Sequence, residues 1–440
     1  MSRIGPPPVP FCPNPGTRDM ASRACRRSDA TLAWAMIAAA PHPFFTYSAE
    51  VLAWRLGSGQ AVPPPPAAAP EATAARTARV LRALGERRRV ALLGLGSGDL
   101  AAALAAALPE NTGLDVVCLA PDIARKSLAA GRVPWLKPGG PAQLVADASV
   151  QAVCHLLWAK GLAPENTLVT VNPEPAETGE ANSLARVRRL LTAGRLLPDP
   201  GPTPTSRPLP TLALLARADE PALGTFFEAA RGLACQAVIV WDAAEIPPAA
   251  EAAARLDIPV RHLARPLAGD FAAQRNALLA ACPPGWVLSL DPDERPGPGF
   301  AAAVVRIMAC PEAGAAYFPR LTLYPAPGWA KVGHGLWPDW QLRLFRTDAT
   351  PGPRYVRPLH ERLEGHPGAA VLALDAPILH HNRLVADAAG VADKLEAFSR
   401  MAGAARHRLN ADYPTLPLDF FTSLVPGGGP GRCLLLPPGL

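Results

Sequence analysis

The sequence has no closely spaced pair of cysteines, although it contains eight of them in 440 residues. The cysteines are scattered along the chain, and no Cys-x-x-Cys motif occurs. A disulfide framework and a structural zinc site both need paired or clustered cysteines, so neither is predicted. Because several cysteines lie in apolar segments, we interpret them as buried free thiols, and we expect a cytoplasmic protein.

Charged residues and long apolar runs are also scarce. Charged residues make up 18% of the chain and aromatic residues 6%. No basic stripe interleaved with aromatic residues occurs, so we predict no nucleic-acid partner. No apolar run approaches the length of a transmembrane helix. The formal charge of +6 leaves open a peripheral contact with the anionic inner membrane surface.

Proline, by contrast, is abundant, and its 53 residues help to mark the domain boundaries. Residues 1–30 are rich in proline and arginine and lack periodicity, so we expect a disordered leader. The Pro-rich stretch 197–210 cannot continue a helix or a central strand, and we predict a linker between two domains there. The remaining predicted parts are a first domain at 31–196 with an internal Pro/Ala linker at 61–70, a second domain at 211–424, and a loose tail at 425–440.

Both domains show apolar, strand-like segments that alternate with helix-like segments. In the first domain we predict strands at 89–94, 114–120, 143–146 and 167–171. In the second we predict strands at 211–215, 236–241, 260–263 and 285–290, helices at 221–233, 249–256 and 270–281, and an antiparallel segment at 316–323. Such alternation is typical of parallel, doubly wound sheets. The predicted fold class is therefore α/β with two domains.

The most informative segment is an apolar strand that ends in the acidic cluster Asp291-Pro292-Asp293-Glu294. Ligands of open α/β sheets bind at the carboxyl ends of the strands. Carboxylate oxygens suit Mg²⁺ or Mn²⁺, and a cation held by Asp291 and Asp293 can neutralise charge on a departing diphosphate. On the residues alone, an acidic loop that caps the next segment explains the pair equally well.

Six further segments surround this cluster in an order that resembles the family 2 glycosyltransferases of the GT-A fold. The resemblance is closest to the branch that contains the lipopolysaccharide-core glucosyltransferases. The segments are Leu214–Glu220, Ala237–Asp242, Gly269–Asn276, Leu336–Arg346, Pro358–Leu363 and Ile378–Asn382. The resemblance implies inverting, metal-dependent transfer of a sugar from a nucleotide-sugar to a cell-envelope glycan, lipid-linked or protein acceptor.

The resemblance also implies roles for individual residues. Asp339 is the candidate catalytic base, which takes the proton from the acceptor hydroxyl. His380 is a candidate third metal ligand beside Asp291 and Asp293, and Trp337 or Trp340 is expected to form a sugar platform. The complete set of candidate substrate-binding residues is Asp219, Glu220, Asp242, Asp270, Arg275, Asn276, Trp337, Trp340, Gln341, Arg343, His360 and Glu361.

Two segments depart from the family pattern. Ala218 stands where the family has Asn, and Asp242 is followed by Ala-Ala-Glu-Ile in place of the usual Asp- and Ser-containing stretch. These changes affect the expected contacts to the nucleoside and leave the nucleotide undefined. Each candidate also has a structural alternative, such as a tryptophan or histidine packed in the core, Asp339 in a turn, or Arg275 paired with Glu228.

A second motif lies in the first domain, where a strand is followed by Gly94-Leu-Gly96-Ser-Gly98. This turn resembles the one that class I S-adenosylmethionine methyltransferases use to bring their cofactor close to the backbone at a helix start. The resemblance implies a Rossmann-like domain in which these glycines hold S-adenosylmethionine, with Asp122 replacing the missing ribose-binding acid. Because that acid is absent from its usual place, we favour a degenerate domain that holds an acceptor or a partner.

Two alternatives to a glycosyltransferase therefore stay open. One is a bifunctional enzyme that also methylates its glycan, and it depends on the glycine turn. The other is a non-catalytic module that binds a sugar nucleotide, and it depends on the altered stretch after Asp242.

Overall fold

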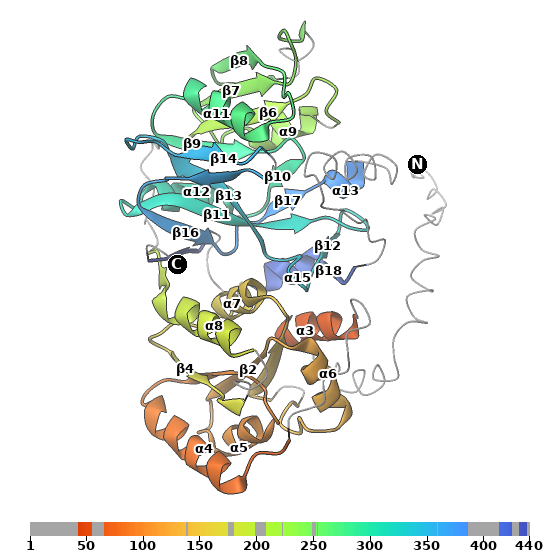
Figure 1. Ribbon diagram of the computed structural model, residues 1–440, viewed down its shortest axis with the longest axis vertical. Helices are drawn as coiled ribbons and strands as arrows, with labels where there is room; N and C mark the ends of the chain where they lie inside the picture. Colours follow the sequence, from red (N-terminus) through yellow and green to blue (C-terminus); the bar gives the residue numbers. More distant parts are fainter. Residues whose placement is uncertain are drawn as a thin grey trace, which may run out of the picture.

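The computed structural model describes residues 43–54, 66–137, 140–174, 180–198, 208–221, 223–248, 252, 254–358, 360–385, 413–424 and 431–437. Within these residues the strands form a four-stranded parallel sheet, a large mixed sheet of eleven strands and two small two-stranded sheets. The two larger sheets belong to successive parts of the chain, and Figure 1 shows them at opposite ends of the molecule. The fold is thus α/β with two domains, as predicted.

The sheet of the first domain has the order β3-β2-β1-β4, and all neighbouring strands are parallel. Its strands are β1 (Arg89–Leu93), β2 (Gly113–Cys118), β3 (Ala142–Ala146) and β4 (Thr167–Val171). The order changes direction between β1 and β4, which creates a crevice at their carboxyl ends. The glycine turn follows β1, so it lies at this switch point.

Helices cover both faces of the first sheet, because both faces of its strands are apolar. One face packs against α4 (Pro70–Leu84), α5 (Asp99–Ala107) and α6 (Pro121–Ala129). The other packs against α7 (Val150–Ala159) and α8 (Ala181–Ala193). A further helix, α3 (Pro43–Ala53), lies beside β3, where Ser48 Oγ donates to the Leu144 carbonyl at 2.9 Å. The expected doubly wound sheet is therefore confirmed.

The second domain begins with a parallel region. Its strands, in the order β9-β6-β7-β8, are β6 (Thr211–Ala216), β7 (Gln236–Trp241), β8 (Val260–Ala264) and β9 (Trp286–Leu290). The helix α9 (Leu223–Ala230) packs on one face and α11 (Phe271–Ala281) on the other. Most of the helix expected at 249–256 lies outside the described residues, and residues 254–256 are not helical.

The rest of the large sheet is mixed. The strand β13 (Asp339–Arg346) is antiparallel to β9, and β11 (Ala313–Thr322) is antiparallel to β13, as expected for this region. Beyond β11 follow β16 (Ala369–Ala373), β19 (Cys433–Leu435) and β5 (Arg195–Leu196). Two short strands, β10 (Glu294–Pro296) and β17 (Ile378–His380), pair with each other, and β17 also pairs with β11. The helix α12 (Phe300–Met308) lies in the same layer as α9.

The strand β19 differs from the expectation of a loose tail. It lies within residues 425–440, and it hydrogen-bonds both to β16 and to β5 at the end of the first domain. Its three residues are buried, with Cys433 fully inaccessible. Burial of this apolar triplet holds residues 433–435 in the sheet, and the triplet is too short to show a periodic pattern.

Four short strands and two short helices complete the described structure. These are β12 (Trp329–Lys331) paired with β18 (Thr415–Pro417), β14 (Arg354–Val356) paired with β15 (Arg362–Glu364), α13 (Asn382–Val385) and α15 (Leu418–Ser423). No helix among the described residues is long and apolar enough to cross a membrane.

The two domains share one hydrophobic core. It contains residues of α7 and α8 from the first domain together with Trp337, Leu372 and Phe420 from the second. Figure 1 shows α7 and α8 between the first sheet and the strands of the second domain. Since this interface is apolar, the domains pack as a fixed pair, and elements of the first domain reach the segment around Asp339.

Candidate functional site

The predicted acidic cluster lies at the carboxyl edge of the parallel strands. Asp291 directly follows β9, and Asp242 directly follows β7, two strands away across β6. Because β6, β7 and β9 are parallel, the segments after them emerge at one edge of the sheet. The structure therefore brings the segments that follow these strands to one edge of the sheet.

Asp291 is held by two arginines. Its Oδ1 accepts from Arg275 Nη2 at 2.8 Å, and its Oδ2 accepts from Arg343 Nη2 at 2.5 Å. Arg275 comes from α11 and Arg343 from β13, and both side chains are 8% exposed. Arg275 also donates to Glu361 at 2.6 Å, so three predicted residues from distant segments meet around Asp291.

The charges in this cluster perturb one another strongly. Burial alone would raise the pKa of Asp291, but the positive charges of Arg343 and Arg275 hold that pKa well below its ordinary value. Burial alone would lower the pKa of each arginine, and the Asp291 carboxylate instead raises both. All three groups are therefore ionised at neutral pH, and each ion pair fixes the others.

Two members of the cluster had no role assigned to them in the sequence prediction. Glu294 is fully buried; its Oε1 accepts from Arg343 at 2.6 Å and from Arg320 at 3.3 Å. Glu294 stands in the acidic motif itself, and its position directly after Asp293 was the available signal. Arg320 gave a weaker one, a single arginine within the apolar strand predicted at 316–323.

Arg320 also holds the candidate base. The antiparallel register of β11 and β13 places Arg320 directly opposite Asp339. Arg320 donates to Asp339 Oδ2 from Nε at 2.9 Å and from Nη2 at 2.6 Å, while Gln341 donates to Oδ1 at 2.7 Å. These hydrogen bonds fix the orientation of the Asp339 carboxylate. The Asp339 side chain is 34% exposed, so the carboxylate is still accessible.

Strand β11 continues the site along one face. Arg320 and Thr322 are two residues apart, so their side chains lie on the same face of the strand. Thr322 Oγ1 is 3.3 Å from His380 Nδ1, and His380 Nε2 is 3.3 Å from Asp293 Oδ2. The predicted residues Asp293 and His380 are therefore neighbours, next to the ion pair between Arg320 and Asp339.

The three predicted metal ligands do not fit a resident metal ion in this arrangement. Both oxygens of Asp291 already accept hydrogen bonds from arginines. Across the described part of the chain, no group of three or more His, Cys, Asp or Glu side chains is placed to hold a metal ion. Mg²⁺ and Mn²⁺ need several oxygen ligands around one point, and the pair of Asp293 and His380 does not supply them.

The residues expected on the nucleoside side lie at the same edge but make local contacts. Asp219 is exposed and pairs with Arg217 at 2.5 Å, and Asp242 accepts from the Leu267 N–H at 2.7 Å. Glu220 is half-buried at the end of the same turn. Asp270 caps α11 by accepting from the Ala273 N–H at 2.9 Å, as expected for a helix start.

Two other predicted substrate contacts have structural partners. Asn276 exchanges hydrogen bonds with the Tyr355 backbone at 2.8 Å, which ties α11 to β14. His360 is exposed in a turn, with a φ of 54° in the left-handed region, and directly precedes Glu361. Asn276 therefore supports the cluster rather than lining it.

Trp337 differs most from its expected role. It is 2% exposed, and its ring lies 4.7 Å from His155 of α7 and 5.5 Å from Tyr47 of α3. It therefore fastens the first domain to the second and is not a sugar platform. Trp340 is half-buried, with its ring 5.2 Å from His155. His155 thus contacts the tryptophans on both sides of Asp339.

A hydrogen-bonded junction reinforces this contact between the domains. The Tyr47 hydroxyl donates to Asp147 Oδ2 at 2.5 Å and accepts from the Gly333 N–H at 3.2 Å. Asp147 Oδ1 accepts from the His334 N–H at 3.1 Å. Burial raises the pKa values of both Tyr47 and Asp147. The side chains of Tyr47 and Asp147 therefore serve as hydrogen-bonding partners in the interface between the domains.

The glycine turn of the first domain is filled by the chain itself. Glu174 Oε2 accepts from the Ser97 N–H at 2.7 Å, and a Cβ atom on Gly96 would lie 2.3 Å from that oxygen. At the end of β2, where methyltransferases carry the ribose-binding acid, Glu180 accepts from the Leu119 N–H at 2.6 Å. Asp122 is exposed and pairs with Arg125. This arrangement does not fit S-adenosylmethionine, because the carboxylates of Glu174 and Glu180 already bind the backbone N–H groups of Ser97 and Leu119 at the expected cofactor position.

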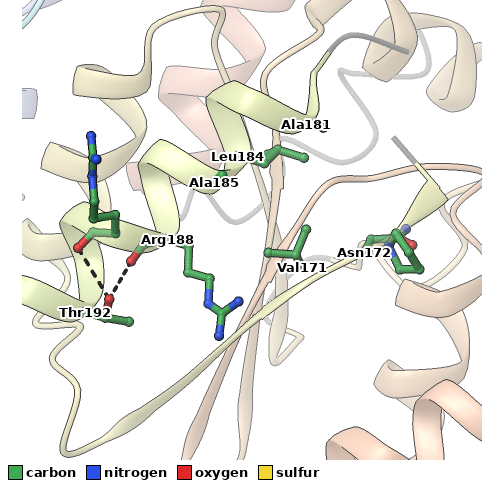
Figure 2. Close-up of a pocket in the computed structure, with 9 residues that line it drawn as sticks. Val171, Asn172, Ala181, Leu184, Ala185, Arg188 and Thr192 are labelled. Atoms are coloured by element: carbon green, nitrogen blue, oxygen red, sulfur yellow. Dashed lines mark hydrogen bonds between the residues drawn. The ribbon is translucent and has the colours of Figure 1, made fainter. Parts of the chain in front are cut away.

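A cavity of about 340 Å³ lies beside this turn, between α8 and the carboxyl end of β4 (Figure 2). Leu184 and Val171 form apolar parts of its lining, and Asn172 borders both the cavity and the glycine turn. The Arg188 side chain extends from α8 toward β4 in this view. None of the lining residues is a predicted site residue, so the cavity is separate from the Asp291 cluster.

Comparison with known proteins gives little further information. No family model matches the sequence, and no curated protein matches it. Among solved structures, the crystal structure of S. aureus TarS aligns with 31% of this chain at 13% identity and a TM-score of 0.24. The alignment spans 28% of that protein's own chain. A likeness of this size does not assign a function.

Proposed function

We propose that this protein is an inverting glycosyltransferase, which moves a sugar from a nucleotide-sugar to a hydroxyl group of a glycan, lipid-linked or protein acceptor. The observation that carries the proposal is the setting of Asp339. Its carboxylate is accessible, is held by Arg320 and Gln341, and lies beside the buried cluster at the carboxyl edge of β9. The family resemblance puts the base and the donor corner at these positions.

In the proposed reaction, the acceptor hydroxyl oxygen attacks the anomeric carbon of the donor. The bond from that carbon to the diphosphate oxygen breaks, and the nucleoside diphosphate leaves with the electron pair. Asp339 accepts the hydroxyl proton. A carboxylate has about four lone-pair sites, and the contacts with Arg320 and Gln341 use three, which leaves one site on Oδ1 for the acceptor.

The direct test compares Asp339→Asn with wild type against a panel of nucleotide-sugars, with and without Mn²⁺. Loss of a general base is expected to lower kcat by about 10²- to 10⁴-fold. Asp348→Asn is the matched control, because Asp348 lies just beyond the same strand and pairs with exposed Arg346. Equal activity of Asp339→Asn and wild type would refute the base.

The alternatives are separated by binding measurements with nucleotide-sugars and with S-adenosylmethionine. A non-catalytic module would bind a nucleotide-sugar without hydrolysing or transferring it. A bifunctional methyltransferase would in addition bind S-adenosylmethionine, which the position of Glu174 argues against. Failure of the folded wild-type protein to bind or turn over any donor would reject the glycosyltransferase altogether.

A further inference from the structure

Lys331 is a buried cation for which the described residues supply no acidic partner. It ends β12 and is 6% exposed. Its Nζ lies 3.6 Å from the centre of the Tyr413 ring and 4.9 Å from that of Tyr324. No carboxylate in the described ranges forms an ion pair with it. Buried charges in proteins are normally paired, so an anion bound beside this amine would be favourable.

A second cation shares the same tyrosine. Arg383 of α13 donates to the Tyr413 hydroxyl at 3.3 Å, and its guanidinium carbon lies 6.0 Å from the ring centre. Burial, together with the smaller effect of the Arg383 charge, lowers the pKa of Lys331 to about 7. Two like charges that face one ring repel each other, and a bound anion would relieve both the repulsion and the desolvation.

One acid that reaches the neighbouring strand does not fill this role. Glu50 of α3 reaches β18, which is the strand paired with β12. Its Oε1 accepts from the Thr415 N–H at 3.2 Å, and the structure gives no ion pair between Glu50 and Lys331. The pair of cations therefore stays uncompensated within the described residues.

The topology connects these cations to the catalytic corner. Arg320, Thr322 and Tyr324 occupy alternate positions along β11 and its continuation, and all three are half-buried while the residues between them are buried. They therefore lie along one face. Arg320 holds Asp339, Thr322 contacts His380, and Tyr324 lies against Lys331. The spacing from Arg320 to Tyr324 is about 13 Å along the strand.

We propose that Lys331 and Arg383 form a phosphate-binding subsite of the glycosyltransferase, next to Asp293 and His380. This inference rests on the proposed function for its place in the reaction. A diphosphate carries at least two negative charges, and a pair of cations matches it in the absence of a fitting metal site. The phosphate belongs either to the nucleotide-sugar or to a phosphorylated acceptor.

Calorimetric titration of the full-length protein tests the subsite without turnover. The probes are inorganic pyrophosphate for the shared chemistry, UDP and GDP for a donor source, and glucose 6-phosphate for an acceptor source. Lys331→Met and Arg383→Gln are each expected to weaken pyrophosphate binding by about tenfold or more. Lys331→Arg, which keeps the charge, and Arg188→Gln, which changes an exposed arginine of the first domain, should bind within about threefold of wild type.

The outcomes are distinct. Pyrophosphate binding that is unchanged in both Lys331→Met and Arg383→Gln overturns the subsite, and so does a wild-type protein that binds none of these anions. Arg383 is half-buried, so Arg383→Gln decides the matter if Lys331→Met does not fold. If Lys331→Met and Arg383→Gln both transfer sugar at the wild-type rate and bind pyrophosphate as wild type does, the subsite is rejected and the proposed glycosyltransferase activity stands. If pyrophosphate binding depends on Lys331 and Arg383 but the wild-type protein transfers no sugar, the subsite stands and the proposed glycosyltransferase activity is rejected.

Discussion

Replacement of Arg343 tests whether the buried cluster is as tightly coupled as its geometry indicates. Arg343→Met removes the donor that binds Asp291 at 2.5 Å and Glu294 at 2.6 Å. Glu294 has no exposed surface, and it would keep Arg320 at 3.3 Å and the Asp291 N–H at 3.1 Å. Removal of one partner from a buried pair costs about 3–5 kcal/mol, and we expect a loss of that size.

The strand itself offers a control. Arg346 lies three residues from Arg343 on β13 and pairs with Asp348, also at 2.5 Å, but the side chains of Arg346 and Asp348 are each 36% exposed. An exposed pair of this kind contributes about 0–1 kcal/mol. Arg346→Met should therefore shift the urea midpoint of unfolding far less than Arg343→Met, although the two ion pairs have the same length.

A double-mutant cycle supplies the decisive number. If Arg343 and Glu294 are coupled through a desolvated contact, the double variant with both residues changed to Met will be less destabilised than the sum of the single variants. The expected coupling is about 1–3 kcal/mol, measured from urea midpoints by tryptophan fluorescence. Additivity within about 0.5 kcal/mol, or an equal effect of Arg346→Met, would refute the buried network.

Three further predictions follow from the other contacts. Tyr47→Phe removes the bond to Asp147 and should lower the free energy of unfolding by about 1–3 kcal/mol in urea, whereas no change would mean that the junction is not formed. The wild-type protein should give no heat with S-adenosylmethionine in calorimetry, because Glu174 occupies the glycine turn, and saturable binding would contradict this. The pKa of Lys331 falls from 10.5 to about 7 on folding, so wild-type stability should rise between about pH 7 and pH 10 as the unfavourable charge is lost. That rise should be absent in Lys331→Met, and equal pH profiles of the two proteins would refute the shift.

The sequence predicted the parallel parts of the fold well. Residues 167–171 and 236–241 were predicted as strands, and β4 and β7 have those same limits. Both strands are apolar runs between turns; β7 is buried on both faces after Gln236, whereas β4 is half-buried beyond Thr167. The short strands β5 and β19 were not predicted, because a strand of two or three residues has no periodic pattern and depends on partners far along the chain.

Several residues of the candidate site were named from the sequence, but their interactions were not. Arg275, Asp291, Arg343 and Glu361 were all named from their motifs, and the structure brings them into one cluster. That the arginines would take both oxygens of Asp291 was not predictable, because it depends on the separation of α11 and β13 across β9. Arg320 was missed for a related reason, since its partner is set by the register of two antiparallel strands.

The distribution of charge around the proposed site favours separate positions for the sugar and for the diphosphate of the donor. Asp291, Glu294, Asp339 and Glu361 face three arginines in the cluster, so this corner carries one more negative than positive charge. A negative corner stabilises the positive charge that develops on a sugar ring in glycosyl transfer. It would repel a departing diphosphate, which needs cations of its own. We infer that the sugar lies toward Asp339 and the diphosphate toward Lys331 and Arg383, so substitution of those cations should slow departure of the diphosphate more than it weakens binding of a neutral sugar.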